Sequence, residues 1–149
     1  GWRGWQAPGK DREKEAHRYW INNGRANIFW QNQFLDQDND FIQDRYPHPF
    51  VEMHPEDMVE LGLNPGDLLE IINDNGVTQG MAYPMPTLKR NTVAMVFGSP
   101  AGSQGNVVNP GVNELVLPDY KHCWGNIRKI SDATAETRAI TFKSHEVVL

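Results

Sequence analysis

The chain has 149 residues, a hydrophobic share of 39% and a formal net charge of −5. This length fits one domain with a single core, and the acidic balance argues against a sequence-independent grip on DNA or RNA, which depends on Lys and Arg neutralising phosphates. It does not exclude one bound nucleotide. The single cysteine, Cys123, excludes an internal disulfide and a cysteine-based metal cluster. No apolar run approaches the ~20 residues of a membrane-spanning helix, and no signal peptide is visible.

Residues 1–18 show no clear period. They hold two isolated tryptophans, Trp2 and Trp5, and a run of charges. The chain also begins with Gly1 rather than Met, so we interpret it as a piece of a longer protein. Residues 1–18 are predicted to be an irregular leader or the tail of a preceding domain, and residues 19–149 are predicted to form the domain proper.

The first predicted elements are a strand and a short helix. Residues 19–23 favour a strand that ends at an Asn-Asn-Gly sequence. Apolar side chains recur at roughly helical spacing over residues 34–46, which predicts a short helix. Asp36 or Asp38 is expected to cap it, and Pro47 to stop it.

A strand over residues 49–53 and a second helix come next. Pro55 suits the first turn of that helix, and the two acidic residues after it suit its positive end. Gly62 is expected to end the helix, because glycine readily takes positive φ. The residues expected to face inward are Met58, Leu61 and Val59.

Strands and tight turns then alternate. Residues 64–67, Asn-Pro-Gly-Asp, predict a turn. The buried strand that follows is expected to contain Leu68, Leu69, Ile71 and Ile72. Asn75-Gly76 is the strongest hairpin signal in the chain, and it leads into a returning strand over residues 77–85. Residues 92–98 predict a further strand that is buried on both faces.

The last third of the chain begins with a long Gly/Ser/Asn/Pro loop, residues 99–112. Loops of this length in a compact domain tend to be functional. Short strands are predicted at residues 113–118, 125–130 and 139–142. The total of six to eight short strands, two short helices and no βαβ alternation predicts a mainly β fold, a small closed barrel with short helices covering its gaps.

One stretch does not resemble plain core sequence. Residues 19–33, YWINNGRANIFWQNQ, combine Asn and Gln amides, a glycine, an arginine and aromatic residues. Amides can both donate and accept hydrogen bonds, Gly24 lets backbone approach a ligand closely, and Arg25 can form a forked pair with phosphate oxygens. On the residues alone, an Asn-Gly turn followed by a surface arginine, with Trp30 in the core, is the simpler interpretation.

A longer block carries a family resemblance. Residues 54–84 run through a short helix, Leu-Gly, a Pro-Gly-Asp turn, a strand, an Asn-Gly turn and a strand. This block resembles the C-terminal domain of molybdopterin-dinucleotide oxidoreductases, the dimethyl-sulfoxide-reductase family. The flanking segments that also match are Asn22–Arg25, Trp30–Gln33, Asn113–Leu115, Asp119 and Tyr120–Cys123. Within the family, NNGRANIFWQ, AYPMPTLKR and WGNIRKI resemble the large subunit of arsenite oxidases.

The resemblance covers residues 19–143 and implies a double-psi β-barrel of the aspartate-decarboxylase type. It implies that the barrel closes over a bis-(molybdopterin guanine dinucleotide) cofactor carrying molybdenum, which preceding domains of the same subunit also hold. Substrate-binding residues and an iron–sulfur cluster would lie in those domains, so this piece alone would not turn over. By analogy the enzyme is periplasmic and passes electrons to a Rieske-type iron–sulfur small subunit.

The residues that the resemblance implies as cofactor contacts fall in three segments. The first two supply amides, a glycine, a guanidinium and an indole, and the third supplies an ammonium before the last matched strand. The candidates are Asn23, Gly24, Arg25, Trp30, Gln31, Gln33, Gln104, Asn113 and Lys121, with Asn126 as a weaker one. The competing interpretations are a solvated loop for Gln104 and a surface lysine for Lys121.

Other reactive residue types favour structural roles. The five histidines are scattered, without the close spacing of a zinc site, and His54 is interpreted as the start of the second helix. Cys123 is predicted to be a small buried residue. Four aspartates, Asp36, Asp38, Asp40 and Asp44, are most simply a solvated helix face, since no EF-hand glycine or terminal glutamate follows.

Two other functions stay open at this point. One is the same domain in a different molybdoenzyme, of the formate dehydrogenase or nitrate reductase type. The other is a cofactor-free double-psi barrel that acts as an interaction module. The sequence upstream of residue 1 would distinguish them.

Overall fold

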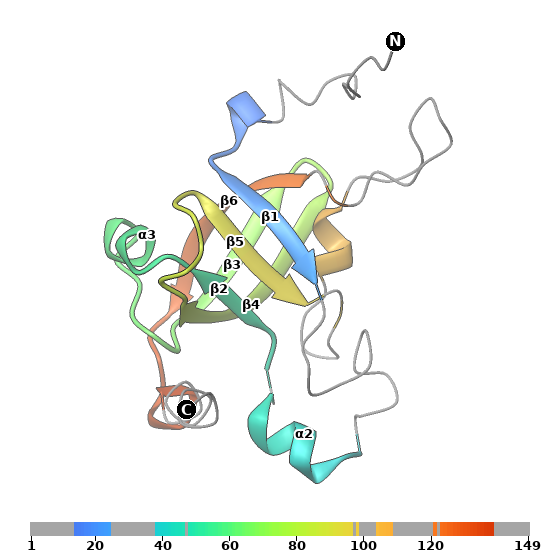
Figure 1. The fold of residues 1–149 in the computed structure, drawn as a ribbon, viewed down its shortest axis with the longest axis vertical. Helices are drawn as coiled ribbons and strands as arrows, with labels where there is room; N and C mark the ends of the chain where they lie inside the picture. The colour runs from blue at the N-terminus through green and yellow to red at the C-terminus, as the bar shows by residue number, and fades with distance from the viewer. Residues whose placement is uncertain are drawn as a thin grey trace.

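The structure is a computed structural model that describes residues 14–24, 38–46, 48–96, 98, 104–108, 121 and 123–138. Its centre is a closed six-stranded barrel with the neighbour order β1-β5-β2-β4-β3-β6 (Figure 1). The strands are β1 (Tyr19–Gly24), β2 (Phe50–Met53), β3 (Leu68–Asn73), β4 (Gly76–Pro84), β5 (Thr92–Val96) and β6 (Cys123–Ser131).

The barrel mixes parallel and antiparallel pairs. β1 runs parallel to β5, and β2 runs parallel to β4, whereas the other neighbours are antiparallel. Closure leaves no free sheet edge within the barrel. The prediction of a mainly β barrel with short covering helices is confirmed, and the double-psi connectivity stays a prediction. The predicted strands at 113–118 and 139–142 lie outside the described residues.

Alternation along the strands builds the core. In β1 the side chains of Tyr19, Ile21 and Asn23 are buried, while those between them are exposed. Fully buried aliphatic side chains from β2, β3 and β5 meet them. In β3 the side chains of Leu69, Glu70 and Ile71 are buried, and Leu68 is half-buried. Ile72 alternates with the buried Ile71 and Asn73, which places its side chain on the outward face. Ile72, predicted to be buried, is 40% exposed.

Helix α3 (Pro55–Glu60) follows the predicted chemistry. His54 precedes it as the N-cap, and its Nδ1 accepts a hydrogen bond from the Glu56 backbone N–H at 3.2 Å. Gly62 takes φ 64° just after the helix, which favours glycine. Met58 is buried, but Val59 is 78% exposed, so the expectation that it faces inward is wrong. A six-residue helix buries only one stripe, and Val59 lies beside that stripe.

Helix α2 (Asp40–Arg45) begins later than the sequence pattern suggests. Its N-cap is Asn39, whose side chain accepts from the Phe41 backbone N–H at 3.1 Å. The prediction that Asp36 or Asp38 caps this helix is therefore wrong. Several residues in a row have cap-forming side chains here, and periodicity does not separate neighbouring choices.

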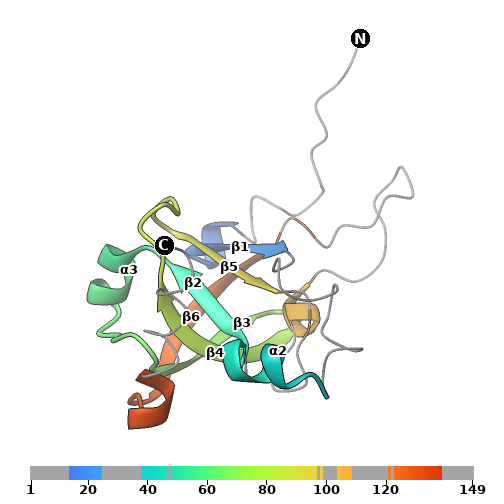
Figure 2. The ribbon, with the colours of Figure 1, turned by 60° about the horizontal axis from the view of Figure 1, so that its bottom comes forward.

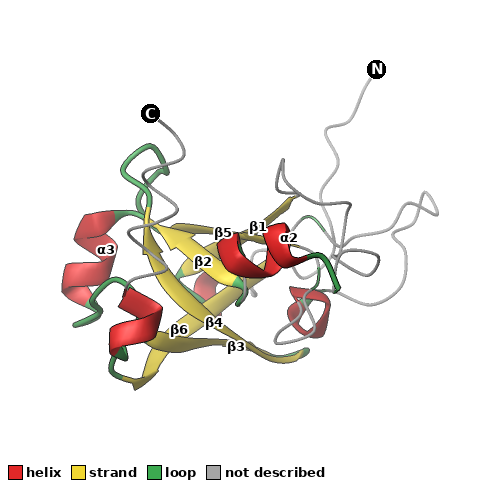
Figure 3. Cartoon of the chain, turned by 90° about the horizontal axis from the view of Figure 1, so that it is seen from below, coloured by secondary structure: helices red, strands yellow, loops and turns green. Residues whose placement is uncertain are grey.

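The helical pieces occupy different sides of the barrel. Figures 2 and 3 show α3 and the helical turn at residues 135–138 on one side, and α2 and the short 3₁₀ helix η1 (Gln104–Val107) on the other. The predicted long loop thus contains a 3₁₀ turn. No helix among the described residues is long and apolar enough to cross a membrane.

Candidate functional site

One end of the barrel gathers the segments that carry the predicted site residues. β1 ends at Gly24, whose register partner is Val96 at the end of the parallel strand β5. Lys121 lies just before β6, whose Cys123 pairs with Ile21 of β1. We call this end the mouth, defined by Asn23, Gly24, Val96, Lys121 and η1. Figure 1 shows η1 beside the tip of β1.

A lysine and an asparagine from distant parts of the chain meet at the mouth. The Lys121 ammonium donates to the backbone oxygen of Asn23 at 3.0 Å and also to its side-chain oxygen. Asn23 is only 4% exposed. An ammonium has three donors and no acceptor, so these two bonds place a positive charge over the inward-facing end of β1.

The 3₁₀ helix η1 is fixed to the mouth by a buried asparagine. Asn73 donates to the carbonyl oxygen of Val107 at 2.7 Å and to that of Trp124 at 3.0 Å. Its side-chain oxygen accepts from the backbone N–H of Asn75 and of Gly76. One side chain therefore joins the β3–β4 hairpin, η1 and the start of β6.

Two glycines near the mouth differ in what surrounds them. A Cβ built on Gly76 would lie 2.5 Å from the Asn106 carbonyl oxygen, so η1 packs directly on the hairpin backbone. A Cβ built on Gly24 would meet no atom of the described residues within 4 Å. The hairpin glycine thus allows close packing, and the described residues leave space beside Gly24 at the strand end.

The structure describes part of the predicted site. Asn23, Gly24 and Lys121 come together at the mouth, and Gln104 begins η1. Asn126 instead anchors the segment before β1, since it accepts from the Arg18 backbone N–H at 3.0 Å and donates to the Ala16 oxygen. The predicted contacts that lie outside the described residues are Arg25, Trp30, Gln31, Gln33 and Asn113.

The opposite end of the barrel, beside α3, is closed by ion pairs. Arg90 reaches the buried Asp57 at 2.5 Å, Glu56 at 2.5 Å, and Glu60. Arg18 also pairs with Glu60. The Asn91 backbone N–H donates to Asp57 at 2.7 Å.

The ion pairs of Arg18 and Arg90 with Glu56, Asp57 and Glu60, called the α3-end network, shift the pKa values of Glu60 and Arg90. The sequence did not predict this network. Hydrogen bonds from Arg18 and Arg90 lower the pKa of Glu60, and hydrogen bonds to Asp57 and Glu60 raise the pKa of Arg90. The partners are 30 to 42 positions apart in the chain. No local spacing rule indicates such a pairing.

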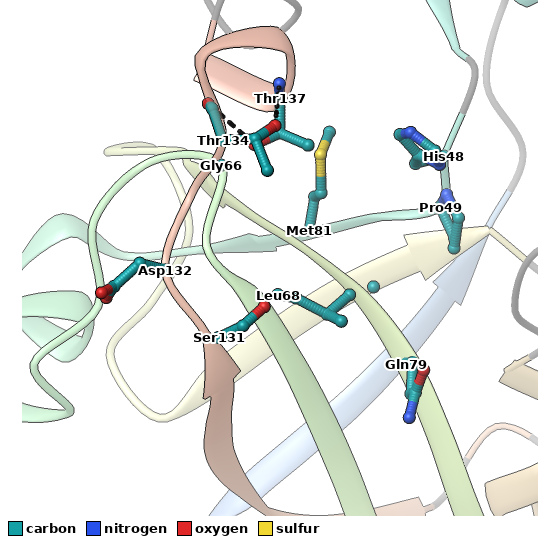
Figure 4. Close-up of a pocket in the computed structure, with 11 residues that line it drawn as sticks. His48, Pro49, Gly66, Leu68, Gln79, Met81, Ser131, Asp132, Thr134 and Thr137 are labelled. Carbon is teal, nitrogen blue, oxygen red and sulfur yellow. Dashed lines mark hydrogen bonds between the residues drawn. The ribbon is translucent and has the colours of Figure 1, made fainter.

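A cavity of about 250 Å³ lies away from the network, between His48, Pro49, Met81 and the residues around Thr137. In the close-up (Figure 4), His48 and Pro49 face Thr134 and Thr137 across the Met81 side chain. Its volume is below the ~300–1,000 Å³ typical of small-molecule pockets. None of the described residues that line it is a predicted contact, so we place the candidate site at the mouth.

The remaining reactive residues have structural surroundings. Cys123 is fully buried, as predicted. Asp38, Asp40 and Asp44 are exposed, which agrees with a solvated face. Among the described residues, no group of three or more His, Cys, Asp or Glu side chains is arranged to hold a metal ion.

Comparison with known families decides what the barrel is. Residues 19–126 match the family model described as "Molydopterin dinucleotide binding domain". The chain belongs to this family. The resemblance drawn from the Leu-Gly…Pro-Gly-Asp block and its flanks is thereby confirmed.

Individual relatives come from several molybdoenzyme subunits. The chain is 39% identical over 142 residues, 95% of its length, to "Arsenite oxidase subunit AioA" of Herminiimonas arsenicoxydans. It is 36% identical over 61 residues, 41% of its length, to "Iodate reductase subunit IdrA" of Denitromonas iodatirespirans. It is 29% identical over 55% of its length to "F420-dependent formate dehydrogenase subunit alpha" of Methanocaldococcus jannaschii.

A solved structure shares the fold. "Acetylene Hydratase from Pelobacter acetylenicus" superposes with a TM-score of 0.64 over 85% of this chain at 15% identity, and the match spans 21% of that protein. The three curated relatives are also far longer, with 17%, 7% and 12% of their lengths matched. In these proteins the matched domain is one part of a larger subunit.

Proposed function

We propose that this chain is the C-terminal cofactor-binding domain of the large subunit of a molybdenum oxidoreductase that oxidises arsenite to arsenate. In this proposal it holds one side of a bis-(molybdopterin guanine dinucleotide) cofactor. The observation that carries the substrate assignment is the 39% identity to the arsenite oxidase subunit across 95% of the chain. The formate dehydrogenase match is weaker, at 29% over 55%.

The described residues of the mouth fit such a group. A pterin dinucleotide carries an anionic pyrophosphate and heteroaromatic ends with many hydrogen-bonding atoms. Lys121 supplies a positive charge beside the amide of Asn23. Gly24 leaves the backbone at the end of β1 open to close approach as far as the structure describes the chain, because no atom of the described residues lies within 4 Å of its absent Cβ. This combination of cation, amide and open backbone suits an anionic, polar ligand.

In this proposal the protein part of the mechanism is binding and orientation. The bound cofactor supplies two-electron oxo transfer. Lys121 offsets negative charge on the dinucleotide, and Asn23 holds the ammonium in place. We assign forked phosphate contact to Arg25 and pterin- or guanine-edge contacts to Gln31, Gln33, Gln104 and Asn113, with Trp30 as an apolar wall.

Interactions elsewhere in the barrel hold the elements around the mouth in place. The Asn73 bonds fix η1 and the start of β6 beside the mouth, and the ion pairs at α3 fix the opposite end of the barrel. A binding site built on such rigid elements keeps its geometry better than one carried by unsupported loops. The domain therefore acts as a platform that covers the cofactor and excludes water.

The proposal includes partners that this chain does not contain. Preceding domains of the same subunit would hold the other side of the cofactor and the substrate. By analogy, electrons would pass to a Rieske-type iron–sulfur small subunit in the periplasm. The chain by itself would not turn over.

The test uses the complete large subunit that contains this chain, purified with its cofactor. We expect stoichiometric molybdenum and pterin, and reduction of a dye with arsenite as the electron donor. Formate as donor and iodate as acceptor are run in parallel. Activity with formate or iodate alone would replace the substrate assignment but keep the domain assignment, whereas a subunit without pterin would refute both.

A further inference from the structure

We infer that Trp20 is a positioning residue for Lys121, and that β1 holds this lysine at both its backbone and its side chain. The inference rests on the proposed function, because it concerns the cation that the proposal places at the cofactor. It adds a residue that does not itself reach the mouth.

The first contact holds the lysine backbone. The indole N–H of Trp20 donates to the carbonyl oxygen of Lys121 at 3.3 Å. Trp20 lies on the outward face of β1, is 41% exposed, and has Trp124 of β6 as its register partner. The bond thus reaches along the outside of the barrel, past the last paired residues of the two strands.

The second contact holds the lysine side chain. The Lys121 ammonium donates to the backbone and side-chain oxygens of Asn23, which faces inward. Trp20 and Asn23 are three positions apart on one strand and lie on opposite faces. Lys121 therefore passes from the outside of the barrel to its mouth, with β1 holding it at each end.

Hydrogen bonds at both the backbone and the side chain of Lys121 matter because a lysine side chain has many rotamers. Fixing it in one conformation costs conformational entropy. Among the described residues, Ile21 with Cys123 is the β1–β6 pair nearest to Lys121. The indole bond adds a restraint on the Lys121 backbone at this point. A restrained backbone lets the ammonium lie over Asn23 before any ligand arrives, which lowers the cost of binding.

The experiment is a double-mutant cycle in the complete cofactor-loaded subunit. Trp20→Phe keeps an apolar ring but removes the N–H, and Lys121→Ala removes the ammonium. Molybdenum per folded polypeptide and the absorption spectrum of the bound cofactor are measured for each variant and for the double variant. We expect Trp20→Phe to weaken cofactor retention by about fivefold, the usual effect of one lost hydrogen bond. In the Lys121→Ala background the same change should have no further effect.

Two additional variants separate positioning from general stability. Trp124→Phe removes an indole N–H from the register partner on the neighbouring strand, and it should leave cofactor retention unchanged. Lys121→Arg keeps a cation, and it should retain most of the cofactor only while Trp20 is present. If Trp20→Phe accumulates poorly, Trp20→His keeps a ring N–H and should restore part of the retention.

The outcomes distinguish the inference from the proposed function. Additive losses from Trp20→Phe and Lys121→Ala, or an equal loss from Trp124→Phe, would overturn the positioning role. Full retention in Trp20→Phe alongside a loss in Lys121→Ala would also overturn it and would leave the proposed function standing. Full retention in Lys121→Ala would remove the lysine from the proposed site, and the inference with it.

Discussion

The two ends of the barrel are built from different residue types, ion pairs at the α3 end and mainly amides at the mouth. At the α3 end, Arg18 and Arg90 form ion pairs with the carboxylates of Asp57 and Glu60. These charges are therefore balanced by partners within the domain. At the mouth, the interactions of Asn23 and Asn73 use neutral amides and backbone, with the Lys121 ammonium as the cation. Removing one partner of a buried charge pair destabilises a fold, whereas amides and an ammonium suit a polar, anionic ligand.

The comparison leads to a division of effects between substitutions. Changes at the α3 end and at the Asp67 turn should reduce the free energy of unfolding and leave the cofactor chemistry intact. Changes at the mouth should have small effects on unfolding and large ones on cofactor retention.

The largest expected effect on stability is that of Asp57→Ala. Asp57 is fully buried and accepts from the Arg90 Nε–H and from the Asn91 backbone N–H, so its loss removes this acceptor from both, while Arg90 keeps Glu56 and Glu60. We expect the free energy of unfolding, measured by urea denaturation, to fall by about 2–4 kcal/mol. Asp74→Ala is the matched control, because Asp74 is 91% exposed and, among the described residues, its side chain forms an ion pair with His17 at 3.6 Å. A similar loss in both variants would contradict the account.

Gly66→Val should follow closely. Gly66 takes φ 87° in the turn before β3, a conformation that β-branched residues disfavour, and an added Cβ would lie 3.1 Å from the backbone of Thr137 and Arg138. We expect a loss of about 2 kcal/mol in unfolding free energy. Calorimetry of the variant checks it, and an unchanged melting temperature would show that the turn tolerates a side chain.

Acid should weaken the same turn through Asp67. Burial alone would raise the pKa of this carboxyl, but hydrogen bonds from the backbone of Asn64, the Lys129 ammonium and the backbone of Ala133 outweigh burial and lower it. A folded-state pKa below the unfolded value stabilises the protein fully above the unfolded pKa, near 4, and this stabilisation is lost as pH falls through the folded pKa.

Asp67→Asn removes that titration. The variant should be less stable than the parent at pH 7 and should lose less further stability between about pH 5 and pH 3. Unfolding curves across this range measure the difference. Some slope will remain, since the pKa of Glu60 is also lowered, by Arg18 and Arg90. Parallel pH profiles for parent and variant would show that Asp67 does not titrate as described.

The smallest effect on stability is expected for Gly24→Ala. No atom of the described residues lies within 4 Å of the added Cβ, and Gly24 is not among the described glycines with positive φ. The free energy of unfolding should change by less than about 0.5 kcal/mol. In the complete subunit the methyl group would stand where backbone approaches the ligand, so cofactor content should fall. A large fall in the free energy of unfolding would contradict the assignment of Gly24 to ligand binding rather than to folding.

Sequence patterns predicted the features that depend on local chemistry. Pro55 and Gly62 lie where the start and the end of a helix require them. The predicted hairpin also forms, but its turn is Asp74-Asn75, and Gly76 already pairs with Asn73 at the start of β4. The Pro-Gly-Asp turn was also predicted, but the reason for its aspartate was not. In the structure Asp67 binds the Lys129 ammonium at 2.6 Å and the Ala133 N–H at 2.7 Å, more than sixty positions away.

The sequence predicts which residue types form the candidate site, but it does not predict how they are arranged in space. An amide-rich stretch and a lysine before the last described strand were identified, but no pattern shows that Lys121 contacts Asn23 at a separation of 98 residues. The indole bond from Trp20 spans 101 residues and depends on β1 and β6 becoming neighbours. Such contacts follow from the barrel closure, which sequence periodicity does not encode.

The central claim is that the mouth holds the cofactor, and molybdenum content per folded polypeptide tests it most directly. In the complete subunit, Arg25→Ala, Asn113→Ala and Lys121→Ala are compared with Lys129→Ala. Lys129 is a matched control, because its ammonium is held by Asp67 and Asp132 toward the other end of β6. The account predicts that the Arg25, Asn113 and Lys121 variants lose molybdenum and pterin while remaining folded, and that Lys129→Ala keeps both. Full occupancy in all three of the first variants would contradict it.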